Sequence, residues 1–360
     1  MDMSLDYSAL GPLFALSRDA VTGIENGIVR FANPAAQKLL GVREGDDAGQ
    51  VFPEDILRSP SERFVAAGSI GGRSLTVSVT RHSGLSLYVI PREEPSADRL
   101  PEGAAAEMGA LLMTERMAID RLVDLSGAAS GGGDAEKYAS ILYRTHFRAK
   151  RLQTHLAMTA LLQKGALPCE QKLVALDEVA ADICDTTRSL AADTGVELRF
   201  EAGEPCRILG DRRLLEILLF NLLSNSLLHT KPGDTIRVTL APQGQRCILA
   251  VDDNGEGIPP DRLAELLPGG AHPDMANPAA GTGLGLPLAR GIAELHGGVL
   301  LLESREDGGA RLRVSFPLLS QTESFELNEP EPMRPDGADL ALTELSVVLD
   351  RSVYTPRMFD

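Results

Sequence analysis

Residues 280–298 read AGTGLGLPLARGIAELHGG, and this glycine-rich stretch is the most informative segment of the chain. Gly281, Gly283 and Gly285 occupy alternate positions directly before an apolar segment with helical spacing. Glycines placed there let backbone N–H groups at a helix N-terminus approach an anion closely, which favours phosphate. Neither GxxxxGK[ST] nor GxGxxG occurs, so neither a P-loop nor a dinucleotide-binding turn is predicted. A tight structural turn is the alternative interpretation.

A second motif lies in the apolar helix predicted to begin at Asp211. Asn221 and Asn225 are four residues apart and therefore share one helix face. An unpaired buried amide costs about 1–3 kcal/mol, so both side chains need partners. Two amides in register favour a polar ligand over structural capping.

A third motif, VDDNGEGIPP at residues 251–260, ends a predicted strand with Asp253 and continues with Gly255 and Gly257. A carboxylate at a strand end beside flexible backbone can accept a hydrogen bond from an exocyclic amine such as adenine N6. An ordinary Asx–glycine turn is the alternative.

Composition limits the class of protein. The 360 residues suffice for two or three domains, and the net charge of −16 argues against non-specific binding to nucleic acid or anionic lipid. The four cysteines form no CxxC pair, so neither a zinc site nor a disulfide framework is expected. The N-terminus lacks a signal-peptide pattern, and the most apolar stretch, LLEILLFNLLSNSLL, is too short and too polar to span a bilayer. A cytoplasmic protein without a membrane span is expected.

The pattern along the chain predicts an α+β multidomain protein. Residues 8–95 favour an antiparallel sheet with a few helices, one of which starts near Asn33. Residues 102–166 predict a helical hairpin, either paired with a second copy as a four-helix bundle or packed on a neighbouring domain. Residues 173–319 predict a two-layer α/β sandwich, and the acidic tail 320–360 contains one apolar patch that favours a docking helix.

The order and spacing of the three motifs resemble the ATP-binding domain of sensor histidine kinases, which belongs to a wider family shared with gyrase-type ATPases. The resemblance covers about residues 173–319. It implies ATP and Mg²⁺ as cofactors, with Asn225 as the Mg²⁺ ligand and Asp253 as the acceptor for adenine N6. The remaining residues that it assigns to the ATP site are Asn221, Gly255, Gly257, Gly281, Gly283, Leu284 and Gly285.

Segments upstream agree with the same family. NGIVRFANPAAQKLLG, residues 26–41, is similar to the beginning of a PAS sensor domain, and the hairpin takes the place of the dimerisation and phosphotransfer helices. The resemblance implies a homodimeric kinase in a two-component-type signalling system, which transfers the γ-phosphoryl group of ATP to histidine. A response regulator or a partner kinase would be its partner.

The phosphoacceptor block of the family, S-H-E-[LF]-R-T-P, is absent, and the aligned acceptor position is Met113. His146 is the candidate acceptor, although Phe147 replaces the acid that assists proton transfer in the family. His155 lies beside an apolar stripe and is expected to be a packing residue.

The chain also has fewer residues that could contact phosphate than the family has. Leu228 stands where the family has lysine, and the lid segment 264–281 contains no lysine or arginine. Asn221 also occupies the position of the general-base glutamate of the hydrolysing relatives, and an amide cannot take a proton from water. Phosphoryl transfer is therefore expected rather than ATP hydrolysis, and an ATP-binding pseudokinase or scaffold is the alternative.

Overall fold

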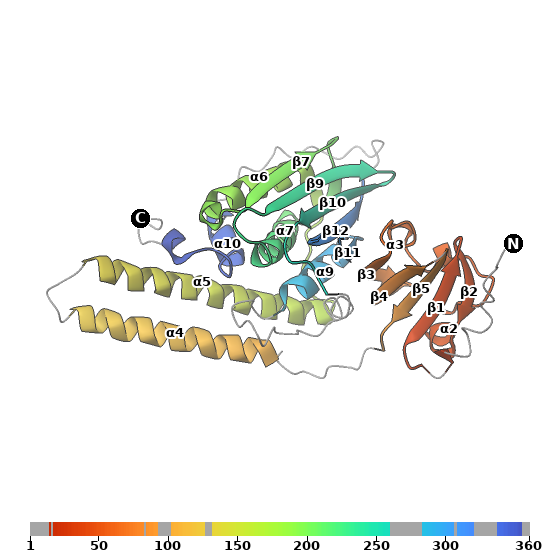
Figure 1. Cartoon of the computed structure of the whole chain (residues 1–360), viewed down its shortest axis with the longest axis horizontal. Coiled ribbons are helices and arrows are strands. Elements are labelled where there is room, and N and C mark those ends of the chain that lie inside the picture. Colours follow the sequence, from red (N-terminus) through yellow and green to blue (C-terminus); the bar gives the residue numbers. More distant parts are fainter. Residues whose placement is uncertain are drawn as a thin grey trace.

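The computed structural model describes residues 14–15, 17–82, 84–92, 102–126, 132–259, 283–305, 308–319 and 337–354. It is an α+β structure in which a helical hairpin lies along one side of a long mixed sheet and its helices (Figure 1). The predicted fold class is confirmed at this level.

The N-terminal unit is an antiparallel sheet with strand order β2-β1-β5-β4-β3. The helix expected near Asn33 is present, since the Asn33 side chain caps α2 by accepting from Ala36 N over 2.9 Å. The elements of this unit are β1 (Ala20–Glu25), β2 (Ile28–Ala32), α2 (Pro34–Leu40), η2 (Ala48–Gln50), α3 (Glu54–Leu57), β3 (Arg63–Ile70), β4 (Arg73–His82) and β5 (Leu85–Ile90).

The hairpin consists of α4 (Glu102–Ser126) and α5 (Gly132–Gln163). Leu111 of α4 and Leu152 of α5 are buried together. Helix α5 also packs on the C-terminal unit, whereas α4 leaves Leu112, Met113 and Met117 exposed, Met113 to 74%. The hairpin is therefore partnered on its α5 side and carries an open apolar face on α4.

The C-terminal unit has strand order β11-β12-β10-β9-β7, in which only β7 runs parallel to its neighbour. Helices α6, α7 and α9 bury their apolar faces in the same core as these strands. The elements are β6 (Lys172–Ala175), α6 (Leu176–Leu190), η3 (Ala192–Thr194), β7 (Glu197–Ala202), β8 (Arg207–Gly210), α7 (Arg212–Leu228), β9 (Thr235–Gln243), β10 (Arg246–Asp253), α9 (Gly285–Leu295), β11 (Val299–Ser304) and β12 (Ala310–Pro317).

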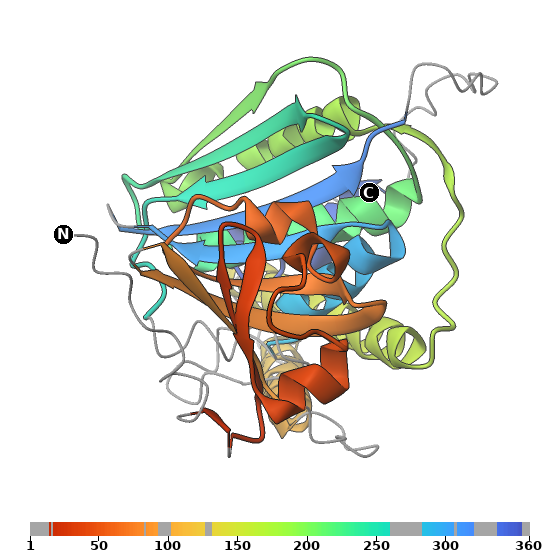
Figure 2. The same cartoon turned by 90° about the vertical axis from the view of Figure 1, so that its right-hand side faces the viewer.

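The two sheets join edge to edge, which the sequence did not lead us to expect. Strand β3 pairs antiparallel with β11, with Leu300 opposite Ala67 and Glu303 opposite Phe64, so that one sheet of ten strands crosses both units (Figure 2). Buried polar side chains add further contacts at this junction. Glu303 accepts from Ser59 Oγ over 2.9 Å and forms an ion pair with Arg313.

The acidic tail contributes a C-terminal segment, which we define as residues 337–354. It consists of α10 (Gly337–Glu344), a turn and η5 (Arg351–Val353). Helix α10 packs against both α5 and α7, so the tail contains a helix at the apolar patch (Figure 1). Among the described helices, none is long and apolar enough to cross a membrane.

Candidate functional site

Helix α7 carries the two asparagines. Asp211 caps the helix by accepting from Leu214 N over 3.2 Å. Asn225 is half-buried, and its side chain makes no hydrogen bond within the described residues. Its amide is therefore available to a ligand.

Asn221, by contrast, is already engaged on every side. It is 2% exposed, and its Nδ2 atom donates to Ile217 O over 2.8 Å and to Glu344 Oε2 over 3.2 Å. Its Oδ1 atom accepts from Arg151 Nη2 over 3.1 Å. Both amide protons are used, so a ligand contact through Nδ2 would require one of these bonds to be exchanged.

Asp253 ends β10 in a buried position. Its Oδ1 atom accepts from Ala310 N over 3.0 Å and from Gly255 N over 3.1 Å, whereas Oδ2 has no hydrogen bond within the described residues. Burial raises the pKa of Asp253, and the two backbone bonds oppose that shift. Hydrogen bonding from Ser226 on α7 lowers this pKa as well, although the buried Oγ atom of Ser226 meets the strict geometry of a hydrogen bond with none of the described residues. Among the described residues, no backbone donor reaches the Oδ2 atom of Asp253, so this oxygen can accept from a polar ligand.

The backbone around Asp253 is packed too tightly for side chains. A Cβ at Gly255 would lie 2.2 Å from the carbonyl oxygen of His229, and one at Gly309, where φ is +83°, would lie 2.0 Å from the carbonyl oxygen of Asp253. Gly257 also has a positive φ, of +73°. Glycine at these positions brings the loop after β10 close against the end of α7.

The glycine-rich stretch leads into α9 as predicted, and its end contacts α7. A Cβ at Gly285 would lie 2.7 Å from Asn221 Oδ1, so only glycine lets the helix start this close to the amide. Gly283 is exposed with φ of +68°, and Leu284 is buried between Leu111 and Leu152 of the hairpin. Gly281 and the lid lie outside the described residues.

The site also includes a residue that the sequence analysis missed. Glu344 of the C-terminal segment is completely buried, and its Oε2 atom lies 2.8 Å from His155 Nε2 and 3.4 Å from Arg151 Nε. Burial raises the pKa of Glu344, but His155 and Arg151 outweigh it and hold that pKa below its ordinary value. His155 is buried as expected, but as a hydrogen-bonding partner. The only signal in the sequence was a carboxylate inside the apolar patch ADLALTELSVVL.

The structure places the candidate acceptor His146 on the exposed surface of α5, with its ring edge-on to Phe147 at 5.7 Å. No group of three or more His, Cys, Asp or Glu side chains among the described residues could hold a metal ion. The oxygens of a nucleotide phosphate can supply further ligands to a cation held at Asn225.

These features follow one another along α7, since Gly285 lies at Asn221 and Asp253 lies near Ser226 and His229. Asp253 and Ser226 offer an acceptor and a hydroxyl at one end, and Asn225 offers an amide. The N-terminus of α9 offers a positive helix dipole to an anion at the other end. A ligand with an amine at one end and phosphate at the other fits this arrangement.

Comparison with known proteins identifies the domain that contains these residues. Residues 210–320 match the family described as histidine kinase-, DNA gyrase B- and HSP90-like ATPase. This span includes α7, β10, α9 and β12, and therefore every described residue that the sequence analysis assigned to the ATP site.

Three relatives are sensor kinases. The sensor protein KdpD of Escherichia coli strain K12 is 28% identical over 202 residues, which cover 56% of this chain and 22% of KdpD. The alginate biosynthesis sensor protein KinB of Pseudomonas aeruginosa is 36% identical over 124 residues, or 34% of this chain and 20% of KinB. The histidine protein kinase DivJ of Caulobacter vibrioides is 30% identical over 275 residues, or 71% of this chain and 44% of DivJ.

The chain thus spans less than half the length of each of these relatives. It is homologous to sensor histidine kinases, and its residues 210–320 carry their type of ATPase domain.

Proposed function

We propose that this chain is a protein-histidine kinase of a two-component-type signalling system, which transfers the γ-phosphoryl group of ATP to a histidine. The observation that carries the proposal is the buried Asp253, whose Oδ2 atom accepts no backbone hydrogen bond within the described residues, beside the Ser226 hydroxyl. Its position within a domain of the histidine kinase type makes ATP the ligand with the best fit.

In the proposed complex, Asp253 accepts a hydrogen bond from the adenine N6 amine. Asn225 would hold Mg²⁺ through its free side-chain oxygen, and the ion would neutralise charge on the phosphates. The N-terminus of α9, with Gly283 and Gly285, would receive the phosphates through backbone N–H groups.

Transfer of a phosphoryl group depends on in-line positioning and on stabilisation of charge more than on covalent help from the protein. Asn221 cannot act as a general base toward water, which favours transfer to a side chain over hydrolysis. His146 is the proposed acceptor because it lies exposed on α5, the hairpin helix that contacts α9. The sensor kinases among the relatives do not favour the pseudokinase alternative.

We further propose that the chain works as a homodimer. Leu112, Met113 and Met117 form an exposed apolar face on α4, which a second hairpin would bury in a four-helix bundle. A response regulator would then receive the phosphoryl group.

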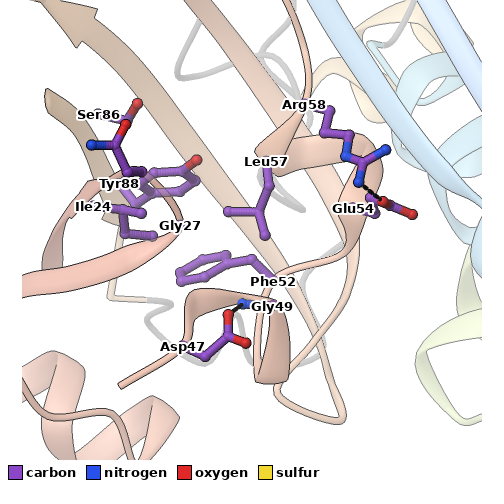
Figure 3. Close-up of a pocket in the computed structure, with 11 residues that line it drawn as sticks. Ile24, Gly27, Asp47, Gly49, Phe52, Glu54, Leu57, Arg58, Ser86 and Tyr88 are labelled. Carbon is purple, nitrogen blue, oxygen red and sulfur yellow. Dashed lines mark hydrogen bonds and ion pairs between the residues drawn. The ribbon is translucent and has the colours of Figure 1, made fainter. Parts of the chain in front are cut away.

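The N-terminal unit is the proposed sensor, of the PAS type. A pocket of about 660 Å³ lies between strands β1 and β5 and the segment that contains α3, lined in part by Phe52, Leu57 and Tyr88 (Figure 3). A pocket of this size can hold a small organic ligand.

The test is incubation of the purified chain with γ-labelled ATP and Mg²⁺, with Asn225→Ala as control. Acid-labile, base-stable label that is absent from the control is expected, and peptide mapping should place it on His146. Label on another residue would make the acceptor assignment wrong. Bound nucleotide without any label would make the kinase assignment wrong and leave an ATP-binding scaffold.

A further inference from the structure

A cation from the hairpin lies at the N-terminus of α9. Arg151 of α5 donates from Nη2 to Asn221 Oδ1 over 3.1 Å, and a Cβ at Gly285 would lie 3.7 Å from the same Nη2 atom. The side chain of Arg151 is only 13% exposed, so it is held at this junction. Arg151 therefore brings a guanidinium to the end of the site where the phosphates are proposed to lie.

A carboxylate of the C-terminal segment already engages this guanidinium. Glu344 Oε2 lies 3.4 Å from Arg151 Nε, and it also accepts from His155 and Asn221. The Oε1 atom of Glu344 is buried without a hydrogen bond within the described residues. A negative charge is thus buried beside a helix end that is suited to bind an anion.

Two anions at one guanidinium compete with each other. The 3.4 Å contact between Arg151 and Glu344 is longer than the roughly 2.7–2.9 Å of a strong charge-assisted hydrogen bond, so this contact can be exchanged. A phosphate group offers a guanidinium two parallel hydrogen bonds and more negative charge than one carboxylate. Phosphate binding must weaken the contact of Glu344 by the same factor by which Glu344 weakens phosphate binding.

We propose that Arg151 binds the terminal phosphate of ATP and that Glu344 of the C-terminal segment competes with that phosphate for Arg151. The inference rests on the proposed function. Without nucleotide, Glu344 ties α5 to α7 through Arg151 and Asn221. With ATP bound, Arg151 turns to the γ-phosphate, and the C-terminal segment loses one of its contacts to the hairpin.

Calorimetric titration of the full chain with ADP and with a non-hydrolysable ATP analogue, both with Mg²⁺, separates the terminal phosphate from the rest of the nucleotide. Arg151→Gln should weaken binding of the analogue about tenfold or more and leave ADP within about twofold, as expected for loss of a charged hydrogen bond. Arg151→Lys keeps the charge without the planar fork and should lose part of this affinity. Glu344→Gln should tighten binding of the analogue several-fold and leave ADP unchanged.

The controls come from a surface ion pair between the same two elements. Lys150 and Asp339 are 42% and 48% exposed, and neither Lys150→Gln nor Asp339→Asn should change either affinity. In the double variant Arg151→Gln/Glu344→Gln, the gain from the second change should vanish, because Glu344 acts through Arg151. Thermal unfolding shows which variants are folded.

A second readout does not depend on affinity. Diethyl pyrocarbonate, which acylates accessible histidine, should modify His155 faster when the ATP analogue is bound, since His155 shares the carboxylate of Glu344. Any of three results would overturn the inference. His155 could react at the same rate with and without the analogue; Arg151→Gln could lose ADP binding and analogue binding equally; or Glu344→Gln could bind the analogue more weakly than wild type. A wild-type chain that binds neither nucleotide would defeat the proposed function itself, whereas one that binds both with no difference among variants defeats only this inference.

Discussion

Replacement of Glu303 by alanine tests whether the N-terminal sheet and the ATPase sheet unfold as one body. Glu303 is 2% exposed; it accepts from Ser59 of the N-terminal unit across the β3–β11 junction and forms an ion pair with Arg313 on β12 of its own unit. Removal of one partner of a buried ion pair costs about 3–5 kcal/mol. Arg313 keeps a bond to Ser59 and is 20% exposed, so we expect a smaller loss of unfolding free energy, about 2–3 kcal/mol.

Differential scanning calorimetry measures this loss. At about 2–4 °C per kcal/mol, the factor for cooperative units of about 150–250 residues, the unfolding midpoint should fall by about 4–12 °C. The single transition should also broaden or divide, because the N-terminal unit then melts earlier. Glu54→Gln is the matched control, since Glu54 pairs with Arg58 on the surface with side chains 65% and 79% exposed, and it should leave the midpoint unchanged. A Glu303→Ala protein that melts as the wild type does would refute the reasoning.

Three further outcomes are expected. Gly255→Ala places a Cβ 2.2 Å from His229 O and should lower the unfolding free energy in urea by about 1–3 kcal/mol, whereas Gly109→Ala on open surface of α4 should not lower it. Asp253→Ala should weaken ATP binding about tenfold or more in calorimetry while pyrophosphate binding stays unchanged, because only the adenine contact is lost. The depressed pKa of Glu344 gives stability that is complete above its ordinary value of 4.5 and disappears as the pH falls through the lowered pKa. The difference in melting temperature between wild type and Glu344→Gln should therefore stay constant above about pH 5 and shrink as the pH falls below 4.5 through the lowered pKa, whereas a difference that stays constant throughout would show that the ionised carboxylate contributes nothing.

Alternation of apolar and polar residues located the half-buried strands well. RSLTVSVTRH became β4 (Arg73–His82) and RCILAVDD became β10 (Arg246–Asp253). Strand β3, RFVAAGSI, was not expected because nearly all its side chains are buried on both faces. Such a strand lacks the period-two pattern by which strands are recognised, and its pairing with β11 depends on tertiary contact alone.

The parts of the site that depend on short-range patterns could also be predicted from the sequence. The i,i+4 spacing of Asn221 and Asn225 and the strand end at Asp253 are short-range features, and the structure places them on α7 and β10. Glu344 lies 123 residues from Asn221 in sequence, and no spacing rule connects them. Arg151 could not be predicted as a site residue either, because its role depends on how α5 packs against α7 and α9.

The join between β3 and β11 limits how freely the N-terminal unit of this chain can be exchanged for another domain. Each strand would be an open sheet edge without the other, with unpaired backbone groups that invite association with foreign chains. A chimera that replaces residues 20–90 by another sensor would have to supply an edge strand in register with Leu300–Glu303. A replacement domain chosen only for the ligand it binds would leave β11 as an unpaired edge strand. The chimera should then aggregate, even if the replacement domain itself folds well.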